Sequence, residues 1–528
     1  MKTKLGSKSI IGSLVALVVI MVVGLFILSD YMNEYPTHTH AWAEQDHHAL
    51  AIGFINNDFN FFHPEAMIYN KQFPGWWKEA YDTTITSVDF PVHHYIVALM
   101  MRLFGTTSPW VFRLWTLLWG LIGLFFLFKI TFALTGDWPK STLVALVALT
   151  SPVFAYYLNG FLPSIPAFAL GVIGLWFYLR FLDSEARKHF NLSIVFLTLA
   201  MLIRTTFAIE LIAVLCFEVL RIFRKESTLK DKWPAVVFSF LAFGAYFLWN
   251  RHLRLQYGTL FLSELLPPDD LQDAKELLSD AYDNWAFQYF QKLQYRVFAI
   301  LALLAIGMAV FQSIRKKEAH HKALSLWWLL SIYLFGCILF TIAMMQQIEH
   351  HDYYFIDTFF LPLLFLFALV LKAIPKPKGK LLTAAEYLIV GILAVPMVQQ
   401  VTTSQMERRY WEQTALVSYN NYMDSDQFLD SLDISRDAKM LCLYGYAQNG
   451  PFIQMKRKGY IVMWDDEELL NNAFTWDFDY VVIENEKLRD HFDQRSTYFS
   501  QLKLVATNGQ ISVFTADGHP IPERTIPQ

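Results

Sequence analysis

The chain has 528 residues, of which 55% are hydrophobic, 16% aromatic and only 17% charged, with a mean hydropathy of +0.31. A water-soluble globular protein is usually less apolar and carries more charge. The net charge of −4 says little about partners, and no basic block suggests nucleic acid. Three scattered cysteines form no CxxC pair, so we expect no disulfide framework.

The N-terminus, MKTKLGSKSIIGSLVALVVIMVVGLFILSD, is similar to a secretory signal peptide. Its apolar stretch of about 20 residues is too long for a signal-peptide core, and no small-residue cleavage site follows it. We therefore predict an uncleaved first transmembrane helix.

Eleven apolar runs approach the length of about 20 residues that a bilayer span requires. They lie at 9–29, 109–134, 141–158, 164–182, 191–207, 208–222, 233–250, 296–313, 324–345, 354–372 and 382–399. A shorter run at 90–104 carries His93, His94 and Arg102, which predicts a helix lying on the membrane surface. The runs 191–207 and 208–222 form one apolar stretch broken at Arg204.

Charge alternates between the connections. Lys2, Lys4 and Lys8 precede the first span, and the connections ARKHF, RIFRKESTLKDK, SIRKKEAHHK and KAIPKPKGK are basic. With eleven spans they all fall on the N-terminal side, which the positive-inside rule assigns to the cytoplasm. The stretches 30–89 and 252–294 are rich in acidic residues, so we expect both large loops outside.

The pattern changes after residue 400. Residues 401–435 are polar and helix-like, and then the β-rich runs AKMLCLYG, GYIVMW, FDYVVIEN, LKLVATN and ISVFTA alternate with helix-like segments. This alternation predicts a small α/β domain. We expect a transmembrane domain at 1–400, with an outer catalytic loop at 30–108, and an outer domain at 401–528.

Two acidic residues in the first outer loop are candidate bases. Asp46 lies in AEQDHHALAIGF, where a helix would place it on one face with Leu50 and Gly53. The alternative for Asp46 is a solvated acidic helix end. Asp89 precedes a proline in VDFP, which favours an extended backbone there and a helix from Pro91 onward. The alternative for Asp89 is a cap of that helix.

Histidines gather in the predicted outer segments. Glu44 would share a helix face with His47 and His48, and imidazole with carboxylate can bind a divalent metal. No HExxH or HxxEH signature is present, so hydrogen bonding to a phosphate or sugar and ordinary loop packing remain alternatives. His93 and His94 have the same alternatives.

Polar groups also mark the predicted spans. The segment QQIEHHDYYFIDTFFLP clusters His351, Tyr353 and Tyr354 at an outer membrane boundary, where tyrosine often serves only as an anchor. Arg204 interrupts an apolar run, and a charge at membrane depth is a functional candidate. Arg113 lies at the start of a span, and the alternative to a functional role is that its side chain extends to the membrane interface.

The order of these features resembles the GT-C class of polyprenyl-phosphate-sugar-dependent glycosyltransferases. The likeness covers about residues 8–400, and it is strongest to bacterial members of the dolichyl-phosphate-mannose protein mannosyltransferase family, which include the lipid A aminoarabinose transferases. The shared features are an acid early in the first outer loop, a second acid before a short surface helix ending in LFG, and an arginine-bearing span that follows.

The resemblance implies roles for particular residues. Asp46 matches the family's catalytic base and Asp89 its second acid, while HHDYYF is similar to the segment near the lipid phosphate, which implicates His351, Tyr353 and Tyr354. Two positions depart from the family pattern: Ser164 stands where relatives often have an acid, and the usual adjacent acidic pair is split as Glu44-Gln45-Asp46.

We therefore expect a polytopic helical membrane protein of the bacterial inner membrane, with a cytoplasmic N-terminus. It would move a sugar, with inversion, from a polyprenyl-phosphate donor to an envelope lipid, glycan or protein acceptor. Arg204 would stabilise the departing phosphate, and Glu44, His93, His94 and Arg113 would position substrate. No cofactor is required because the leaving group is a monophosphate, although a divalent metal stays open. The alternatives are a lipid or sugar transporter or flippase, and a non-catalytic subunit of an envelope glycan assembly complex.

Overall fold

The computed structural model describes residues 7–315, 325–377, 379–410, 413–491 and 500–516. Lys2, Lys4 and the basic loop around Lys317 lie outside these ranges. The chain forms two compact units, each assembled from segments distant in sequence. We call residues 1–33, 113–246 and 265–407 the helical unit, and residues 34–112, 247–264 and 408–528 the mixed unit. The expected division at residue 400 stays a prediction.

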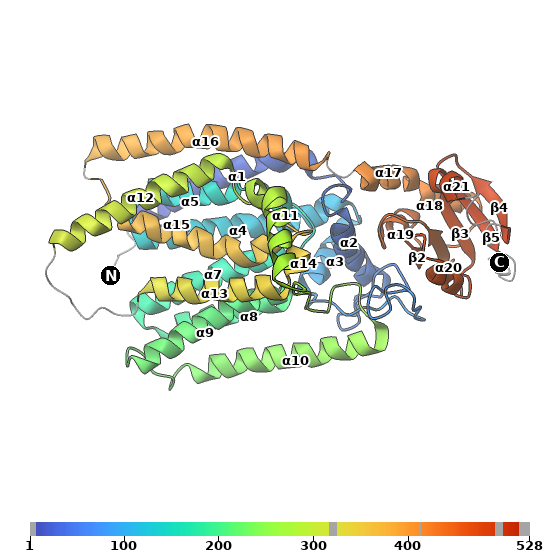
Figure 1. The fold of residues 1–528 in the computed structure, drawn as a ribbon, viewed down its shortest axis with the longest axis horizontal. Helices are drawn as coiled ribbons and strands as arrows, with labels where there is room; N and C mark the ends of the chain where they lie inside the picture. Colours follow the sequence, from blue (N-terminus) through green and yellow to red (C-terminus); the bar gives the residue numbers. More distant parts are fainter. Residues whose placement is uncertain (1–6, 316–324, 378, 411–412, 492–499, 517–528) are drawn as a thin grey trace. The chain divides into compact units, whose positions relative to one another are not determined.

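Helices of 4 to 29 residues make up the helical unit, and the end of one of them, residues 247–257, belongs to the mixed unit (Figure 1). They are α1 (Ser7–Leu28), α4 (Pro109–Thr135), α5 (Trp138–Leu149), α6 (Pro152–Tyr157), α7 (Ser164–Ser184), α8 (Arg187–Ile203), α9 (Ala208–Phe223), α10 (Trp233–Tyr257), α11 (Leu271–Tyr289), α12 (Lys292–Arg315), α13 (Leu326–Ala343), α14 (Met345–Ile348), α15 (Leu361–Ala373) and α16 (Lys380–Arg408). Each of the eleven apolar runs predicted to span the membrane overlaps one or more of them.

Seven helices among the described residues are long and apolar enough to cross a membrane. The chain is a multi-pass membrane protein, and the number of eleven spans stays a prediction. Two apolar runs are each divided into shorter helices by residues at the break. The run 141–158 breaks at Pro152, which follows a Ser151 side chain that caps α6. The run 191–222 breaks at Arg204, whose backbone is extended (φ −147°, ψ 107°).

Helices α7 and α8 pack closely in the helical unit. A Cβ on Gly174 would come within 2.6 Å of the Leu197 side chain. Small residues at such crossings let two helix backbones approach, which is a common way of packing helices in membranes.

The mixed unit contains α2 (Ala41–Asn56), α3 (Val92–Phe104), α17 (Gln413–Tyr422), α18 (Ser425–Ser431) and a five-stranded sheet. The predicted surface helix is α3, which ends at Gly105 in the left-handed conformation (φ 66°) that glycine adopts without strain. Leu99, Leu103 and Phe104 are exposed on it. This exposed apolar face is what a helix lying on a membrane surface requires.

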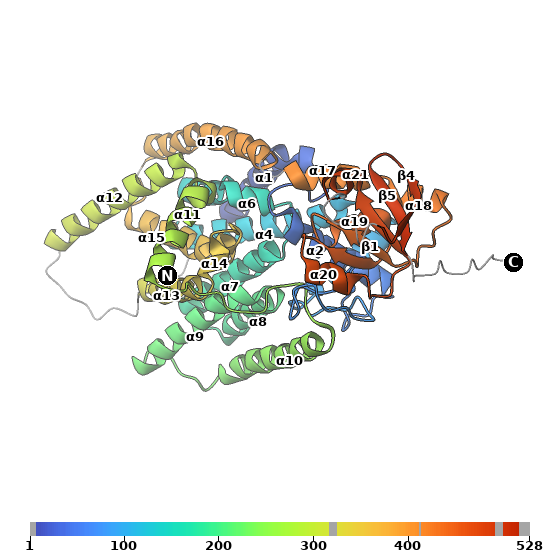
Figure 2. The same ribbon diagram turned by 45° about the vertical axis from the view of Figure 1, so that its right-hand side comes forward.

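All five predicted strands are present: β1 (Met440–Leu443), β2 (Gly459–Val462), β3 (Tyr480–Glu484), β4 (Leu502–Thr507) and β5 (Ile511–Ala516). The sheet order is β2-β1-β3-β5-β4, in which β1 pairs in parallel with β2 and β3, and β5 pairs antiparallel with β3 and β4. Strands β4 and β5 lie side by side in Figure 2. Helices α19 (Gly450–Met455), α20 (Glu467–Ala473) and α21 (Asn485–His491) connect the strands. The small α/β fold expected here is therefore confirmed.

Candidate functional site

Helix α2 forms where the sequence predicts it and lies inside the mixed unit. Glu44 and Asp46 are only 2% and 3% exposed, and His47 and His48 are buried as well. The alternative of a solvated acidic helix end is therefore wrong. Gly53, on the Asp46 face, is needed for this packing because a Cβ there would lie 1.9 Å from the main-chain oxygen of Glu65.

The Asp46 carboxylate accepts hydrogen bonds from two side-chain amides of the C-terminal segment. Gln448 Nε2 donates to Oδ2 at 2.5 Å, and Asn449 Nδ2 donates to Oδ1 at 2.8 Å. Burial raises the pKa of Asp46 to about 7, while the bonds from Asn449, Gln448 and Trp42 act to lower it. The carboxylate is thus held by neutral donors and titrates near neutral pH.

The orientations of both amides are fixed by a second set of bonds. Trp77 Nε1 donates to Gln448 Oε1 at 3.0 Å, and the main-chain N–H of Met67 donates to Asn449 Oδ1 at 3.0 Å. Each amide oxygen is therefore an acceptor, so each amide nitrogen must be the group that faces Asp46. Met67 and Trp77 thus orient the two amides of the C-terminal segment that bond to the carboxylate.

The histidines of α2 bond to other parts of the mixed unit. His47 Nδ1 lies 2.8 Å from His94 Nε2, and His48 Nε2 lies 3.0 Å from the main-chain oxygen of Thr107. Two nitrogens on one tetrahedral zinc would be about 3.3 Å apart, given zinc–nitrogen distances of about 2.0 Å. The first contact is therefore a hydrogen bond. Burial lowers the pKa of His94 to about 3, so this ring is neutral. Among the described ranges there is no group of three or more histidine, cysteine or acidic side chains placed to hold a metal.

Asp89 lies in the same unit, just before α3. The residue at the N-cap of α3 is Pro91, two positions after Asp89, and the role of Asp89 as second acid or cap stays a prediction. His93 and His94 follow on α3 and are buried, 2% and 3% exposed. The mixed unit thus holds both candidate acids and four candidate histidines.

The candidates for the donor phosphate lie in the helical unit and are brought together there. The Arg204 guanidinium lies over the rings of Tyr353 and Tyr354, 5.7 and 5.6 Å from their centroids. Arg204 Nε also donates to Asp357 Oδ2 at 2.7 Å. Asp357 belongs to the π-helical turn Ile356–Phe360, and it is a buried partner that the sequence analysis missed.

His351, the remaining phosphate candidate, and Arg113, a candidate for positioning substrate, also lie in the helical unit. His351 Nδ1 lies 3.1 Å from the main-chain oxygen of Gln347, and its ring centroid is 5.3 Å from that of Tyr353. Arg113 donates to the main-chain oxygen of Asn159 at 2.8 Å and lies over the Phe161 ring, so its side chain is held inside the unit.

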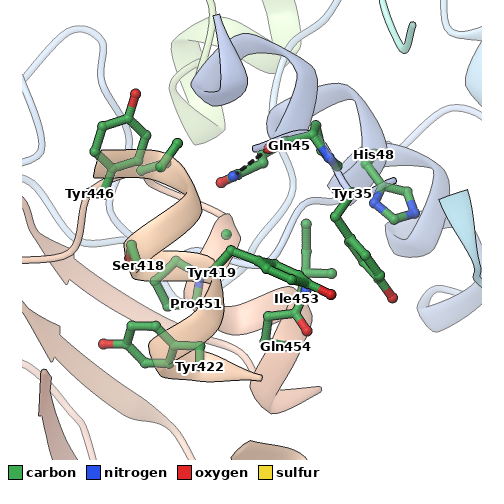
Figure 3. Close-up of a pocket in the computed structure, with 14 residues that line it drawn as sticks. Tyr35, Gln45, His48, Ser418, Tyr419, Tyr422, Tyr446, Pro451, Ile453 and Gln454 are labelled. Carbon is green, nitrogen blue, oxygen red and sulfur yellow. Dashed lines mark hydrogen bonds between the residues drawn. The ribbon is translucent and has the colours of Figure 1, made fainter. Parts of the chain in front are cut away.

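A pocket opens beside the opposite face of α2 in the mixed unit (Figure 3). Gln45 and His48 line it from α2, and Tyr419 lines it from α17. Its empty volume, which includes open solvent, is about 370 Å³. Tyr35 packs on Tyr419 with ring centroids 5.0 Å apart. Planar aromatic faces beside amide groups suit a polar ring such as a sugar.

The residues that the sequence analysis missed had weak local signals. Asp357 interrupts an apolar run, which is the property that singled out Arg204. Gln448 and Asn449 follow β1, and the edge of an open sheet after such a strand is a common ligand site. Lys71 is 1% exposed, and burial lowers its pKa to about 7. Its neighbours in the sequence resemble those of any exposed loop lysine, so the sequence does not reveal that it is buried.

Comparisons with known proteins support the resemblance. Residues 88–249 match the sequence family described as dolichyl-phosphate-mannose-protein mannosyltransferase. ArnT from Cupriavidus metallidurans, bound to undecaprenyl phosphate, is similar with a TM-score of 0.56 at 10% identity, over 95% of this chain and 97% of that chain. A comparison with curated proteins gives no match.

Two further structures share the fold. The apo oligosaccharyltransferase of Archaeoglobus fulgidus has a TM-score of 0.51 at 12% identity, over 97% of this chain and 75% of that chain. Arabinofuranosyltransferase AftD from Mycobacteria has a TM-score of 0.52 at 14% identity, over 95% of this chain but 41% of that chain. The predicted fold class, a GT-C membrane fold with a small C-terminal α/β part, is confirmed.

Proposed function

We propose that the chain is a membrane glycosyltransferase that moves a sugar from a polyprenyl-phosphate donor to an acceptor hydroxyl of the cell envelope. The family match over residues 88–249, the shared fold and the apolar helices support this proposal. ArnT, which has a similar fold, is bound to undecaprenyl phosphate. The reaction would take place at the outer face of the plasma membrane, with a cytoplasmic N-terminus and with residues 408–528 outside.

The observation that carries the proposal is the buried Asp46 carboxylate, whose two oxygens accept from Gln448 and Asn449 and whose pKa burial raises to about 7. A general base works best when its pKa lies close to the operating pH, because it is then both deprotonated and basic enough. In the proposed step Asp46 takes the proton of the acceptor hydroxyl while the oxygen forms a bond to the anomeric carbon. The bond from that carbon to the lipid phosphate breaks, and the phosphate oxygen keeps the electron pair. The configuration at the anomeric carbon inverts.

Arg204 would stabilise the charge that develops on the lipid phosphate, together with His351, Tyr353 and Tyr354. Preorganised donors and cations aimed at a developing charge contribute strongly to catalysis. The ion pair with Asp357 and the two tyrosine rings hold the Arg204 side chain in one orientation. An arginine fixed in this way loses little conformational freedom when a phosphate binds.

The acceptor would enter through the pocket beside α2. Gln45 is 7% exposed, and its Oε1 has no hydrogen-bond partner among the described residues, so it can accept a bond from an acceptor hydroxyl. Tyr419 of the C-terminal segment offers a ring face beside it. Glu44, His93, His94 and Arg113 would position substrate, with Asp89 as the second acid. This chemistry requires no cofactor, since the departing monophosphate needs only the cation and donors described above.

Mass spectrometry of envelope lipids and glycans tests the proposal. Cells with the gene should contain a glycosylated envelope component that a deletion strain lacks, and the deletion strain should accumulate the polyprenyl-phosphate sugar. Restoring Asp46→Asn in place of the wild type should not restore the product. Identical envelope profiles with and without the gene would contradict the proposal and favour a non-catalytic subunit.

A further inference from the structure

The sheet of the mixed unit has a topological switch point at β1. From the carboxyl end of β1 the chain crosses through α19 to β2 on one side, and it then crosses back through α20 to β3 on the other side. Open α/β sheets bind their ligands in the crevice outside the carboxyl ends of the strands at such a point. The loop that leaves β1 here, residues 444–449, carries Gln448 and Asn449.

In this protein the switch-point loop faces helix α2. Gln448 and Asn449 are fully buried, and each donates to a different oxygen of the same carboxylate, Asp46. Their own oxygens are used by Trp77 and Met67. Four hydrogen bonds therefore connect the C-terminal sheet, the outer loop and the candidate base, and both amide groups are fixed in orientation.

We propose that Gln448 and Asn449 are positioning residues that hold both carboxylate oxygens of Asp46, so that the C-terminal segment completes the catalytic centre. This inference rests on the proposed function, because it takes Asp46 as the base. It adds a second role for the C-terminal segment beyond lining the acceptor pocket. The groups that shift the pKa of Asp46, apart from burial, are the neutral donors Asn449, Gln448 and Trp42.

The competing explanation is that the two amides only join the sheet to the outer loop. Asn70 provides a matched control because its side chain also connects the loop to the sheet by hydrogen bonds, but it does not bond to Asp46. Its Nδ2 donates to the main-chain oxygens of Trp77 and Ile461 at 3.0 and 2.8 Å, and its Oδ1 accepts from Ile461 N at 2.9 Å. Asn70 is also fully buried. Asn70→Ala therefore breaks loop-to-sheet bonds of the same kind and leaves the carboxylate donors in place.

The test compares the full-length wild type with Gln448→Met, Asn449→Asp and Asn70→Ala, purified in detergent. The first readout is the pH profile of turnover, using the polyprenyl-phosphate sugar identified by the envelope analysis. Loss of a charge-assisted donor should move the acidic limb of the Gln448→Met profile upward by about one to two pH units. Asn449→Asp should move it further, because two carboxyl groups so close cannot both ionise readily. Asn70→Ala should leave the limb in place.

The second readout needs no substrate. The pKa of Asp46 is raised in the folded state, so its protonated form adds stability that is present below about pH 4 and is lost as pH rises through about 7. The thermal unfolding temperature of the wild type should therefore decline with pH and level off near pH 7. In Gln448→Met the decline should extend to higher pH, and in an Asp46→Asn background the difference between the two proteins should vanish.

The outcomes separate the two explanations. If Gln448→Met and Asn449→Asp lose turnover and stability equally at every pH, as Asn70→Ala would, the amides are only a structural joint and the inference is wrong. If even the wild type transfers no sugar, the proposed function fails, and the unfolding profiles still decide whether the amides control the Asp46 carboxylate.

Discussion

Replacing Asp46 with asparagine removes the proposed base with the smallest change of shape. General-base catalysis contributes roughly 100- to 10,000-fold, so turnover should fall by about that factor. This loss corresponds to about 3 to 5 kcal/mol of transition-state stabilisation. Binding of the donor should change little, because the proposed phosphate ligands Arg204, Tyr353 and Tyr354 are unchanged in this variant.

The structure adds a stability cost that the sequence does not reveal. From the sequence, asparagine would be expected to keep the hydrogen bonds of Asp46. In the structure both oxygens accept from amide nitrogens whose orientations are fixed, so the new side-chain nitrogen would face another donor. A buried donor without an acceptor costs about 1 to 3 kcal/mol. We therefore correct the sequence-based expectation and predict a lowered unfolding temperature as well as slower turnover.

The assay is turnover per folded molecule, with the folded fraction measured by size-exclusion chromatography and thermal unfolding of each variant. Glu44→Gln is the comparison variant, because Glu44 is equally buried on the same helix and is proposed to position substrate rather than to take the proton, so its loss of turnover should be the smaller one. If Glu44→Gln abolishes turnover while Asp46→Asn leaves it intact, the wrong acid has been chosen and the site turns toward Glu44, His47 and His48.

Four further predictions concern the phosphate site, the packing of α2, metal dependence and topology. Arg204→Ala should raise the KM for the polyprenyl-phosphate donor and lower kcat, with an unchanged KM for the acceptor; donor kinetics equal to the wild type would remove Arg204 from the phosphate site. Gly53→Ala should cost about 1 to 3 kcal/mol of stability through overpacking against the Glu65 main chain, and an unchanged unfolding temperature would contradict this packing. Turnover should be unaffected by EDTA, whereas loss that added Mg²⁺ or Zn²⁺ restores would show a metal requirement. An impermeant thiol reagent on intact cells should label a cysteine at Asp270 but not one at Lys225, and the reverse pattern would invert the topology.

Local patterns in the sequence predict much of the fold. The five strands lie where short β-branched and aromatic runs are bounded by turn residues, and the β4–β5 hairpin turns at Asn508-Gly509. Helix α2 is predictable because AEQDHHALAIGF contains no helix-breaking residue before the glycine near its C-terminal end. Local sequence also marks the two places where an apolar run is divided, at Pro152 after the capping Ser151 and at the extended Arg204.

The sites are less predictable than the fold because their contacts join distant residues. The bond between Asn449 and Asp46 spans 403 positions, and the one between Arg204 and Asp357 spans 153. Nothing in the local sequence around Gln448 identifies a carboxylate partner, because the contact depends on how the sheet edge packs on α2. Family resemblance selected Asp46, and the fold supplies the donors that surround it.

The most direct measurement uses the purified protein in lipid vesicles that contain undecaprenyl-phosphate-linked sugars from the deletion strain and an envelope extract as acceptor. Mass spectrometry should then show release of undecaprenyl phosphate together with an equal amount of newly glycosylated acceptor. The acidic limb of the rate should lie near pH 7, and Asp46→Asn should be at least about 100-fold slower. Transfer at the wild-type rate by Asp46→Asn, or no release of undecaprenyl phosphate by the wild type, would contradict the account.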